Sequence, residues 1–163
     1  MTERFKVSVT KDHLVFASGH FISYEGDRCE RLHGHNYRAT VEIEADLDPK
    51  SWYVFDFIAL KRHTKEIVDE LDHRMMLPTK NPVILLHEIG TGIRVRYKDR
   101  EWLFPRADCV LLPIENTTAE LLARYIGERL GAELKKAYGF VADVLRIEVE
   151  ENVGQSATWE LRR

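Results

Sequence analysis

The sequence is poor in cysteine, in long apolar runs and in net charge. Its two cysteines are Cys29 and Cys109, and Cys109 falls in an apolar run at 107–112 that is typical of a buried thiol. A disulfide is therefore not expected, and a reducing cytoplasm fits the chain. No apolar run approaches the roughly 20 residues that a membrane helix needs, and the first residues show no signal peptide. The formal net charge of -3 indicates no nucleic-acid surface.

What is present is the pattern of one folded domain. The 163 residues, 44% of them hydrophobic, predict a single domain over 1–163 without repeats or linkers. Alternation predicts strands at 5–9, 14–21, 37–45, 143–151 and 157–161, and apolar spacing predicts helices at 56–71 and 117–138. Asp56 is the expected N-cap of the first helix, and Gly139 is expected to end the second. These elements predict an α+β domain: an antiparallel four-stranded sheet with two helices on one face, plus an inserted β-hairpin within about 82–113.

Three histidines form the most informative functional pattern. His33 and His35 are two residues apart beside a predicted strand, so their side chains share a face. His20 ends the preceding β-like run and can join them if the two runs pair. Three histidines without a fourth protein ligand are typical of a catalytic zinc site, whose open position takes water or substrate. Cys29 adds a thiol near that position. In the alternative interpretation, these histidines are ordinary hydrogen-bonded or surface residues.

Five separated motifs give the chain a family resemblance. They are the histidine set, the cysteine before HGHNY at 33–37, LDH at 71–73, TTAELLA at 117–123 and VEE at 149–151. Together they resemble the 6-pyruvoyl-tetrahydropterin synthase / 6-carboxytetrahydropterin synthase family over residues 16–159. The resemblance implies a T-fold (tunnelling fold), in which subunits join their sheets into a barrel, usually as a homohexamer of two trimers. It also implies that 7,8-dihydroneopterin triphosphate binds at a site between subunits.

The resemblance assigns roles to individual residues. The implied Zn²⁺ ligands are His20, His33 and His35. The implied general base or proton shuttle is Cys29, with Asp72 and His73 as its partner pair. The implied pterin-binding residues are Glu151, Thr118 and Glu120. Zinc would act as a Lewis acid on the side-chain oxygens of the substrate. A thiol beside a cation is expected to have a lowered pKa, and a carboxylate suits the amino and N–H edge of a pterin.

Several of these residues have a simpler structural interpretation. Asp72 and His73 are expected in irregular chain past the first helix, where His73 can instead act at the helix C-terminus. Glu151 can belong to the solvated face of a strand, although alternation places it with Val149 on the apolar side. The segment 117–120 also matches a capping box, in which Glu120 bonds the start of the second helix.

The order Cys-Glu-x-x-His-Gly-His bears on the reaction. The spacing from Cys29 to His33 resembles that of 6-carboxytetrahydropterin synthases of queuosine biosynthesis, which release acetaldehyde and triphosphate, and this is the predicted activity. Glu30 resembles the glutamate of relatives that cleave the side chain to 6-hydroxymethyl-dihydropterin. The remaining alternatives are a 6-pyruvoyl-tetrahydropterin synthase and a pterin-binding or structural zinc protein without turnover. In the insertion, Arg94, Arg96 and Arg100 either meet the triphosphate or lie on a solvated hairpin.

Overall fold

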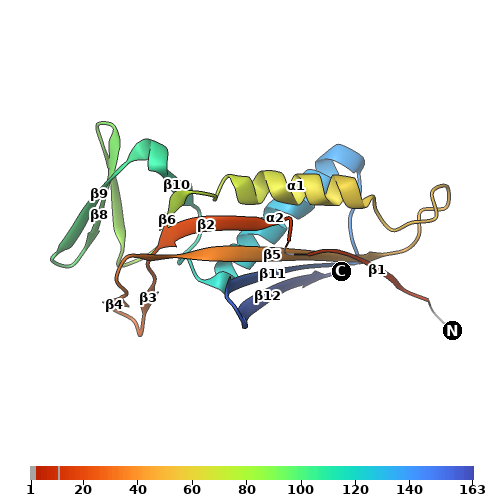
Figure 1. Ribbon diagram of the computed structural model, residues 1–163, viewed down its shortest axis with the longest axis horizontal. Helices are drawn as coiled ribbons and strands as arrows, with labels where there is room; N and C mark the ends of the chain where they lie inside the picture. Colours follow the sequence, from red (N-terminus) through yellow and green to blue (C-terminus); the bar gives the residue numbers. More distant parts are fainter. Residues whose placement is uncertain (1–2, 11) are drawn as a thin grey trace.

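The computed structural model describes residues 3–10 and 12–163, and its centre is a curved seven-stranded sheet with two helices on one face (Figure 1). The sheet strands are β1 (Phe5–Val9), β2 (Val15–His20), β5 (His33–Ala45), β6 (Arg74–Pro78), β10 (Cys109–Leu112), β11 (Val144–Asn152) and β12 (Gln155–Arg162). Their order is β10-β6-β2-β5-β11-β12. The long strand β5 pairs with β2 through its first half and with β1 through its second half.

All five predicted strand ranges are strands of this sheet, which is larger than the predicted four-stranded sheet. β1 with β2, β5, β11 and β12 form the antiparallel part, while β6 and β10 run parallel to β2 and to each other. Neither parallel strand was predicted as part of this sheet. β6 is only five residues long and buried along nearly its whole length, so it lacks the alternation that reveals a half-exposed strand.

The two helices α1 (Phe57–Asp69) and α2 (Ala119–Tyr138) cover the same face of the sheet (Figure 1). The predicted N-cap of α1 is confirmed, because Asp56 Oδ1 accepts a hydrogen bond from Ala59 N at 2.7 Å. α2 ends as predicted at Gly139, whose positive φ of 64° lets its N–H reach the last helical carbonyls. Between helices and sheet lies the main core, which includes Phe16 and Tyr37 with stacked rings. No helix of the described residues is both long and apolar enough to span a membrane.

The insertion is a separate small sheet rather than the predicted hairpin. Its strands are β7 (Leu85–Ile89), β8 (Gly92–Tyr97) and β9 (Arg100–Pro105), followed by the short helix η1 (Arg106–Asp108). The end of the predicted insertion, Cys109–Leu112, is β10 of the main sheet. Figure 1 shows this small sheet at the same end of the molecule as the short hairpin of β3 (Ser23–Tyr24) and β4 (Arg28–Cys29). A second apolar cluster, which includes Phe21 and Trp102, joins the insertion to the main sheet.

Candidate active site

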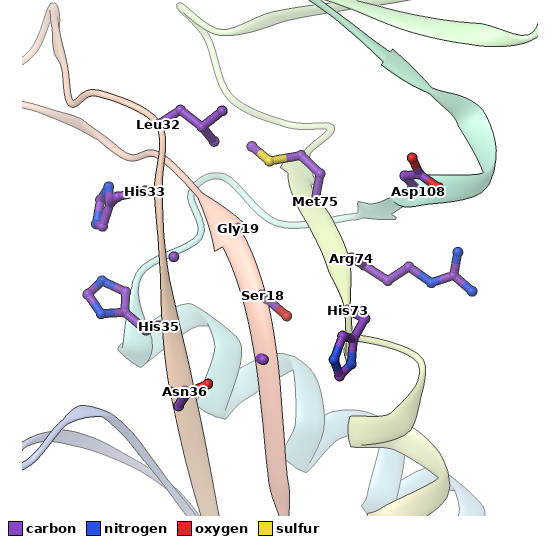
Figure 2. Close-up of a pocket in the computed structure, with 12 residues that line it drawn as sticks. Ser18, Gly19, Leu32, His33, His35, Asn36, His73, Arg74, Met75 and Asp108 are labelled. Carbon is purple, nitrogen blue, oxygen red and sulfur yellow. The ribbon is translucent and has the colours of Figure 1, made fainter.

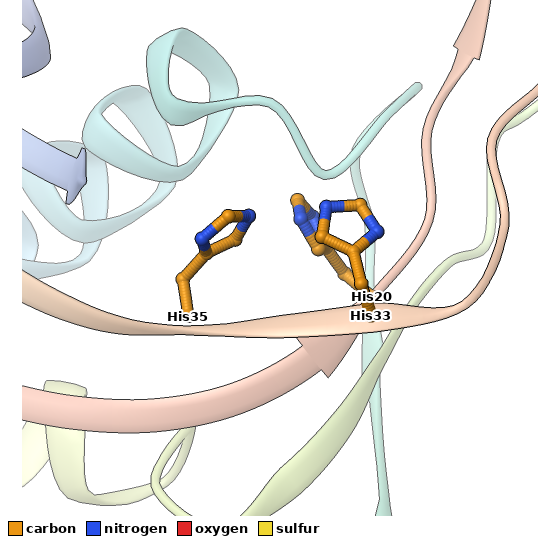
Figure 3. Close-up of side chains that lie close together, drawn as sticks. All are labelled: His20, His33 and His35. Carbon is orange, nitrogen blue, oxygen red and sulfur yellow. The ribbon is translucent and has the colours of Figure 1, made fainter.

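The three histidines meet on one face where β2 and β5 pair. His20 is the last residue of β2 and lies opposite His33, the first residue of β5, with His35 two residues further on (Figure 3). One ligand atom from each residue lies within 4.8 Å of the others. Gly34 permits this close approach of the strands, because a Cβ there would stand 2.9 Å from the carbonyl oxygen of Ser18. The geometry thus excludes the interpretation of three unrelated surface histidines.

Backbone carbonyls orient two of the three rings. His20 Nδ1 lies 3.0 Å from Thr117 O, and His33 Nδ1 lies 2.8 Å from Arg31 O. Since a carbonyl only accepts, each Nδ1 donates to it, which leaves Nε2 as the ring nitrogen available to a metal. Burial lowers the pKa of His35 and so favours its neutral form. Three imidazole nitrogens fit Zn²⁺, with a coordination position left for an oxygen ligand.

Glu151 and Tyr37 border the histidines. Glu151 Oε1 lies 3.2 Å from His20 Nε2 and 3.4 Å from His35 Nε2, and it accepts a hydrogen bond from the Tyr37 hydroxyl at 3.2 Å. The contact with His20 is the main reason why the pKa of Glu151 is lowered. Glu151 therefore does not belong to a solvated strand face; the register of β11 against β12 shifts between Glu150 and Asn152 and frees it from regular pairing.

Tyr37 and Thr117 were not predicted as site residues. Tyr37 follows His35 by two residues on the same face of β5, so strand alternation was a usable signal. Burial raises the pKa of Tyr37, which keeps its hydroxyl protonated as a donor. Thr117 is fully buried before α2, and its Oγ1 lies 3.3 Å from His20 Nδ1. No local pattern in the sequence indicates that contact, because 97 residues separate the two.

Cys29 and Glu30 point in different directions. The Cys29 side chain is half-buried against the second apolar cluster, and its thiol lies 3.5 Å from Glu30 O. Burial raises the pKa of the Cys29 thiol, the opposite of the expected lowering, although the Arg100 guanidinium works against this rise. Glu30 Oε2 instead lies 3.9 Å from His33 Nε2, so its carboxylate is turned toward the histidines. Cys29 is not among the described residues that cluster as metal ligands.

Asp72 and His73 form a pair, but not beside the histidines of the same chain. Asp72 Oδ1 accepts from Ala17 N at 2.7 Å, and its Oδ2 lies 2.9 Å from His73 Nδ1. Burial would raise the pKa of Asp72, but these bonds outweigh it and lower the pKa. His73 has a positive φ of 54° and an 83% exposed side chain. Figure 2 shows β2 between His73 and His35, and two strand spacings amount to roughly 10 Å.

The predicted capping box at the start of α2 is wrong. Thr118 is the N-cap residue, and its side chain makes no cap hydrogen bond to the part of the chain that is described. Thr117 Oγ1 faces His20 and Phe21 O instead, and Glu120 is exposed in the first turn. Thr117 thus forms a long-range contact with His20 instead of a local capping hydrogen bond.

The arginines of the insertion separate into two groups. Arg94 lies 3.4 Å from Glu101 and Arg96 Nε donates to Lys98 O, so both stay on the surface of the small sheet. Arg100 turns inward and donates to the carbonyl oxygens of Cys29 and Glu30. Arg94 and Arg96 are therefore solvated, as one of the two interpretations expected. Arg100 is not, because it binds the backbone of the loop at 29–30.

Comparison with known proteins places this geometry in a family. The family model for 6-pyruvoyl tetrahydropterin synthase matches residues 8–161. A putative 6-carboxy-5,6,7,8-tetrahydropterin synthase of Methanocaldococcus jannaschii is 31% identical over 90% of this chain and 89% of that protein. A shorter match, 39% identical over 36% of this chain and 48% of the relative, is a dihydroneopterin monophosphate aldolase of Pyrococcus furiosus.

A solved structure shares the whole fold. It is Plasmodium vivax 6-pyruvoyltetrahydropterin synthase with alanine in place of a glutamate described as a catalytic residue, and it is 27% identical with a TM-score of 0.90 over 99% of this chain and 100% of that one. This match confirms the T-fold of the subunit. The chain belongs to the 6-pyruvoyl tetrahydropterin synthase family and is a lyase that acts on pterins.

Proposed function

We propose that the protein is a zinc-dependent 6-carboxytetrahydropterin synthase. It would convert 7,8-dihydroneopterin triphosphate to 6-carboxy-5,6,7,8-tetrahydropterin, with release of acetaldehyde and triphosphate, in queuosine biosynthesis. The observation that carries the proposal is the convergence of His20, His33 and His35 with the Glu151 carboxylate on one face of the sheet. The name of the M. jannaschii relative supports this reaction over others of the family.

Each part of the site has a task in this reaction. When bound, Zn²⁺ would supply Lewis acidity toward the oxygens of the substrate side chain. Glu151 would accept the amino and ring N–H groups of the pterin as a bidentate pair, with the Tyr37 hydroxyl holding the carboxylate. Cys29 or Glu30 would remove the side-chain proton. Thr118 and Glu120 stand at the start of α2, next to the Thr117 that holds His20, and would border the pterin.

The Asp72–His73 pair is best explained by a site shared between subunits. Within one chain β2 separates His73 from the histidines, yet the imidazole is exposed and oriented by a carboxylate. An exposed, oriented imidazole with a positive φ is an expensive arrangement that fits a proton-transfer role. We therefore propose that His73 of one subunit completes the histidine site of its neighbour in a homohexamer.

Glu30 supports a second candidate reaction, cleavage of the side chain to 6-hydroxymethyl-dihydropterin. Its carboxylate faces His33, whereas the Cys29 thiol is directed into apolar surroundings. One relative, named a dihydroneopterin monophosphate aldolase, supports this cleavage. The P. vivax relative, named a 6-pyruvoyltetrahydropterin synthase, supports a catalytic role for a glutamate. Glu30 would then be the base that opens the carbon–carbon cleavage.

A product assay distinguishes the two reactions. Zinc-loaded protein is given 7,8-dihydroneopterin triphosphate, and pterins are identified by mass while acetaldehyde is measured in parallel. A 6-carboxypterin with one acetaldehyde per turnover is the expected result, and Cys29→Ala is expected to abolish it. A hydroxymethylpterin that is lost in Glu30→Gln and retained in Cys29→Ala would establish the second candidate, and a pyruvoyl product would contradict both.

A further inference from the structure

The tip of the inserted sheet grips the loop that carries Cys29 and Glu30. Tyr97 at the end of β8 pairs with Arg100 at the start of β9 across a tight turn. Arg100 Nη2 donates to Cys29 O at 2.7 Å, and Arg100 Nη1 donates to Glu30 O at 3.0 Å. One planar guanidinium thus binds two successive carbonyls, a fork that the single ammonium of a lysine cannot reproduce.

The opposite side of the same loop is fixed by the chain itself. Glu30 N donates to Ile22 O at 3.0 Å, so Glu30 is held through its N–H on one side and its carbonyl on the other. Further along, the Tyr97 hydroxyl donates to Asp27 O, and Lys98 Nζ lies 2.8 Å from Asp27 Oδ2. The Lys98–Asp27 pair is exposed and contributes little. Tyr97 therefore holds the loop at Asp27, and Arg100 holds it at Cys29 and Glu30.

Aromatic rings hold the guanidinium in place and connect it to the histidines. The Arg100 guanidinium carbon lies 4.8 Å from the centre of the Tyr97 ring and 5.2 Å from that of Trp102. Trp102 stacks on Phe21 with ring centres 4.8 Å apart, and Phe21 directly follows His20. A side chain confined between rings loses less entropy when it forms its hydrogen bonds.

We infer that Arg100 is a positioning residue of the active site, which fixes the directions in which Cys29 and Glu30 leave the backbone beside the histidines. The inference deepens the proposed function and rests on it for the roles of Cys29 and Glu30. The contacts of Arg100 do not depend on the proposed function. The inserted sheet then contributes to the active site by holding the loop that carries Cys29 and Glu30. The charge of Arg100 also opposes the burial that raises the pKa of the Cys29 thiol.

The test compares Arg100→Gln and Arg100→Lys with a control, Arg94→Gln, on the same sheet. Arg94 is exposed and pairs with Glu101, away from the loop. Amide hydrogen exchange of the peptide 27–32 is measured in the full-length zinc-loaded protein, together with zinc content, thermal midpoint, kcat and KM. In Arg100→Gln we expect exchange about tenfold faster because the loop opens more often. We expect kcat to fall about 100-fold, with KM and zinc content within about twofold.

Arg100→Lys is expected to lie between Arg100→Gln and the wild type, and Arg94→Gln to match the wild type. Unchanged exchange and kcat in Arg100→Gln would overturn the inference. So would a parallel loss of zinc, thermal stability and kcat, which would indicate a purely structural residue. If the wild type itself turns over no pterin, the proposed function fails, while the exchange measurement still decides whether Arg100 fixes the loop.

Discussion

At the scale of single residues, the site depends on how each histidine is held. Carbonyl oxygens of Thr117 and Arg31 fix the Nδ1 protons of His20 and His33, and Tyr37 donates to the carboxylate beside them. His73, in contrast, is oriented by Asp72 on the far side of β2. Under the proposed function the two groups of histidines have separable tasks, metal binding for one and proton transfer for the other.

Single substitutions should separate these tasks. His35→Ala removes one of three ligands, so we expect the zinc content of the purified protein to fall well below the roughly one ion per subunit of the wild type. His73→Ala should keep its zinc and lose activity by roughly 100- to 10,000-fold. Metal analysis with the product assay checks both, and full zinc retention in His35→Ala would contradict the assignment of the metal site.

At the scale of the elements, α2 packs closely on the sheet at one point. Gly127 lies against Trp159 of β12, and a Cβ at Gly127 would stand 2.3 Å from Trp159 Cζ3 and 3.2 Å from Ile147 Cγ1. One turn later in the same helix, a Cβ at Gly131 would meet its nearest atom, Leu145 Cδ2, at 3.4 Å. The sheet thus leaves no room for a side chain at Gly127, whereas a methyl group fits at Gly131.

Alanine at these two positions should change stability in opposite directions. Gly127→Ala forces Trp159 to move and is expected to lower the free energy of unfolding by about 1–3 kcal/mol. Gly131→Ala fits without overlap and should raise it by about 0.5–1 kcal/mol, because alanine favours a helix more than glycine does. Urea unfolding measures both, and equal effects of the two substitutions would show that helix–sheet contact does not decide the result.

An ion pair links the two helices and gives a pH-dependent contribution to stability. Arg129 of α2 binds Glu70 at the end of α1, with Nη2 to Oε1 at 2.8 Å, and this hydrogen bond lowers the pKa of Glu70. The lowered pKa means that the pair stabilises the folded state above the unfolded-state pKa near 4.5. This stabilisation is lost as the pH falls through the lower pKa of the folded state.

Glu70→Gln should therefore destabilise the protein near neutral pH and have no effect in acid. We expect a decrease of the free energy of unfolding of about 0.5–1 kcal/mol at neutral pH, small because the pair is half-exposed. The difference from wild type should vanish in acid, once the pH is below the folded-state pKa and the carboxyl is protonated. Urea unfolding at both pH values is the measurement, with Glu128→Gln on exposed α2 surface as control; a difference that persists in acid would argue against the ion pair.

At the scale of the whole molecule, the proposed function requires two groups of residues that lie on either side of β2 in one chain. The histidines lie on β2 and β5, whereas His73 stands before β6, with β2 in between. The proposed oligomer would bring the two groups together at each interface between neighbouring subunits. An assembly of this kind makes a prediction about mixtures of defective chains.

Co-assembly of His35→Ala and His73→Ala chains should restore activity that neither has alone. In a random one-to-one mixture, about a quarter of the interfaces combine an intact histidine site with an intact His73, so about a quarter of wild-type activity is expected. Co-expression with two affinity tags and tandem purification provides the mixed oligomer. Activity no higher than that of the separate variants would contradict a site shared between subunits.

The local part of this structure was predictable from the sequence, because backbone geometry fixes it. Strand alternation brings His33 and His35 to one face, and Asp56 caps α1 through a carboxylate three residues from its partner. The family motifs likewise indicated the T-fold that the solved relative confirms. Periodicity did not reveal β6 and β10, since these strands are short, and buried and partly exposed residues do not alternate along them.

Only the tertiary structure decided which distant segments meet. The order of the main sheet brings Glu151 of β11 to His20 of β2 and separates His73 from the histidines. The packing of the inserted sheet turns Arg100 toward Cys29, while Arg94 stays exposed. These contacts join residues tens of positions apart, and their geometry follows from the packing of whole elements rather than from any local preference. The sequence by itself determined the chemistry of the side chains and the local elements that carry them. Long-range packing determined which of these side chains share a site.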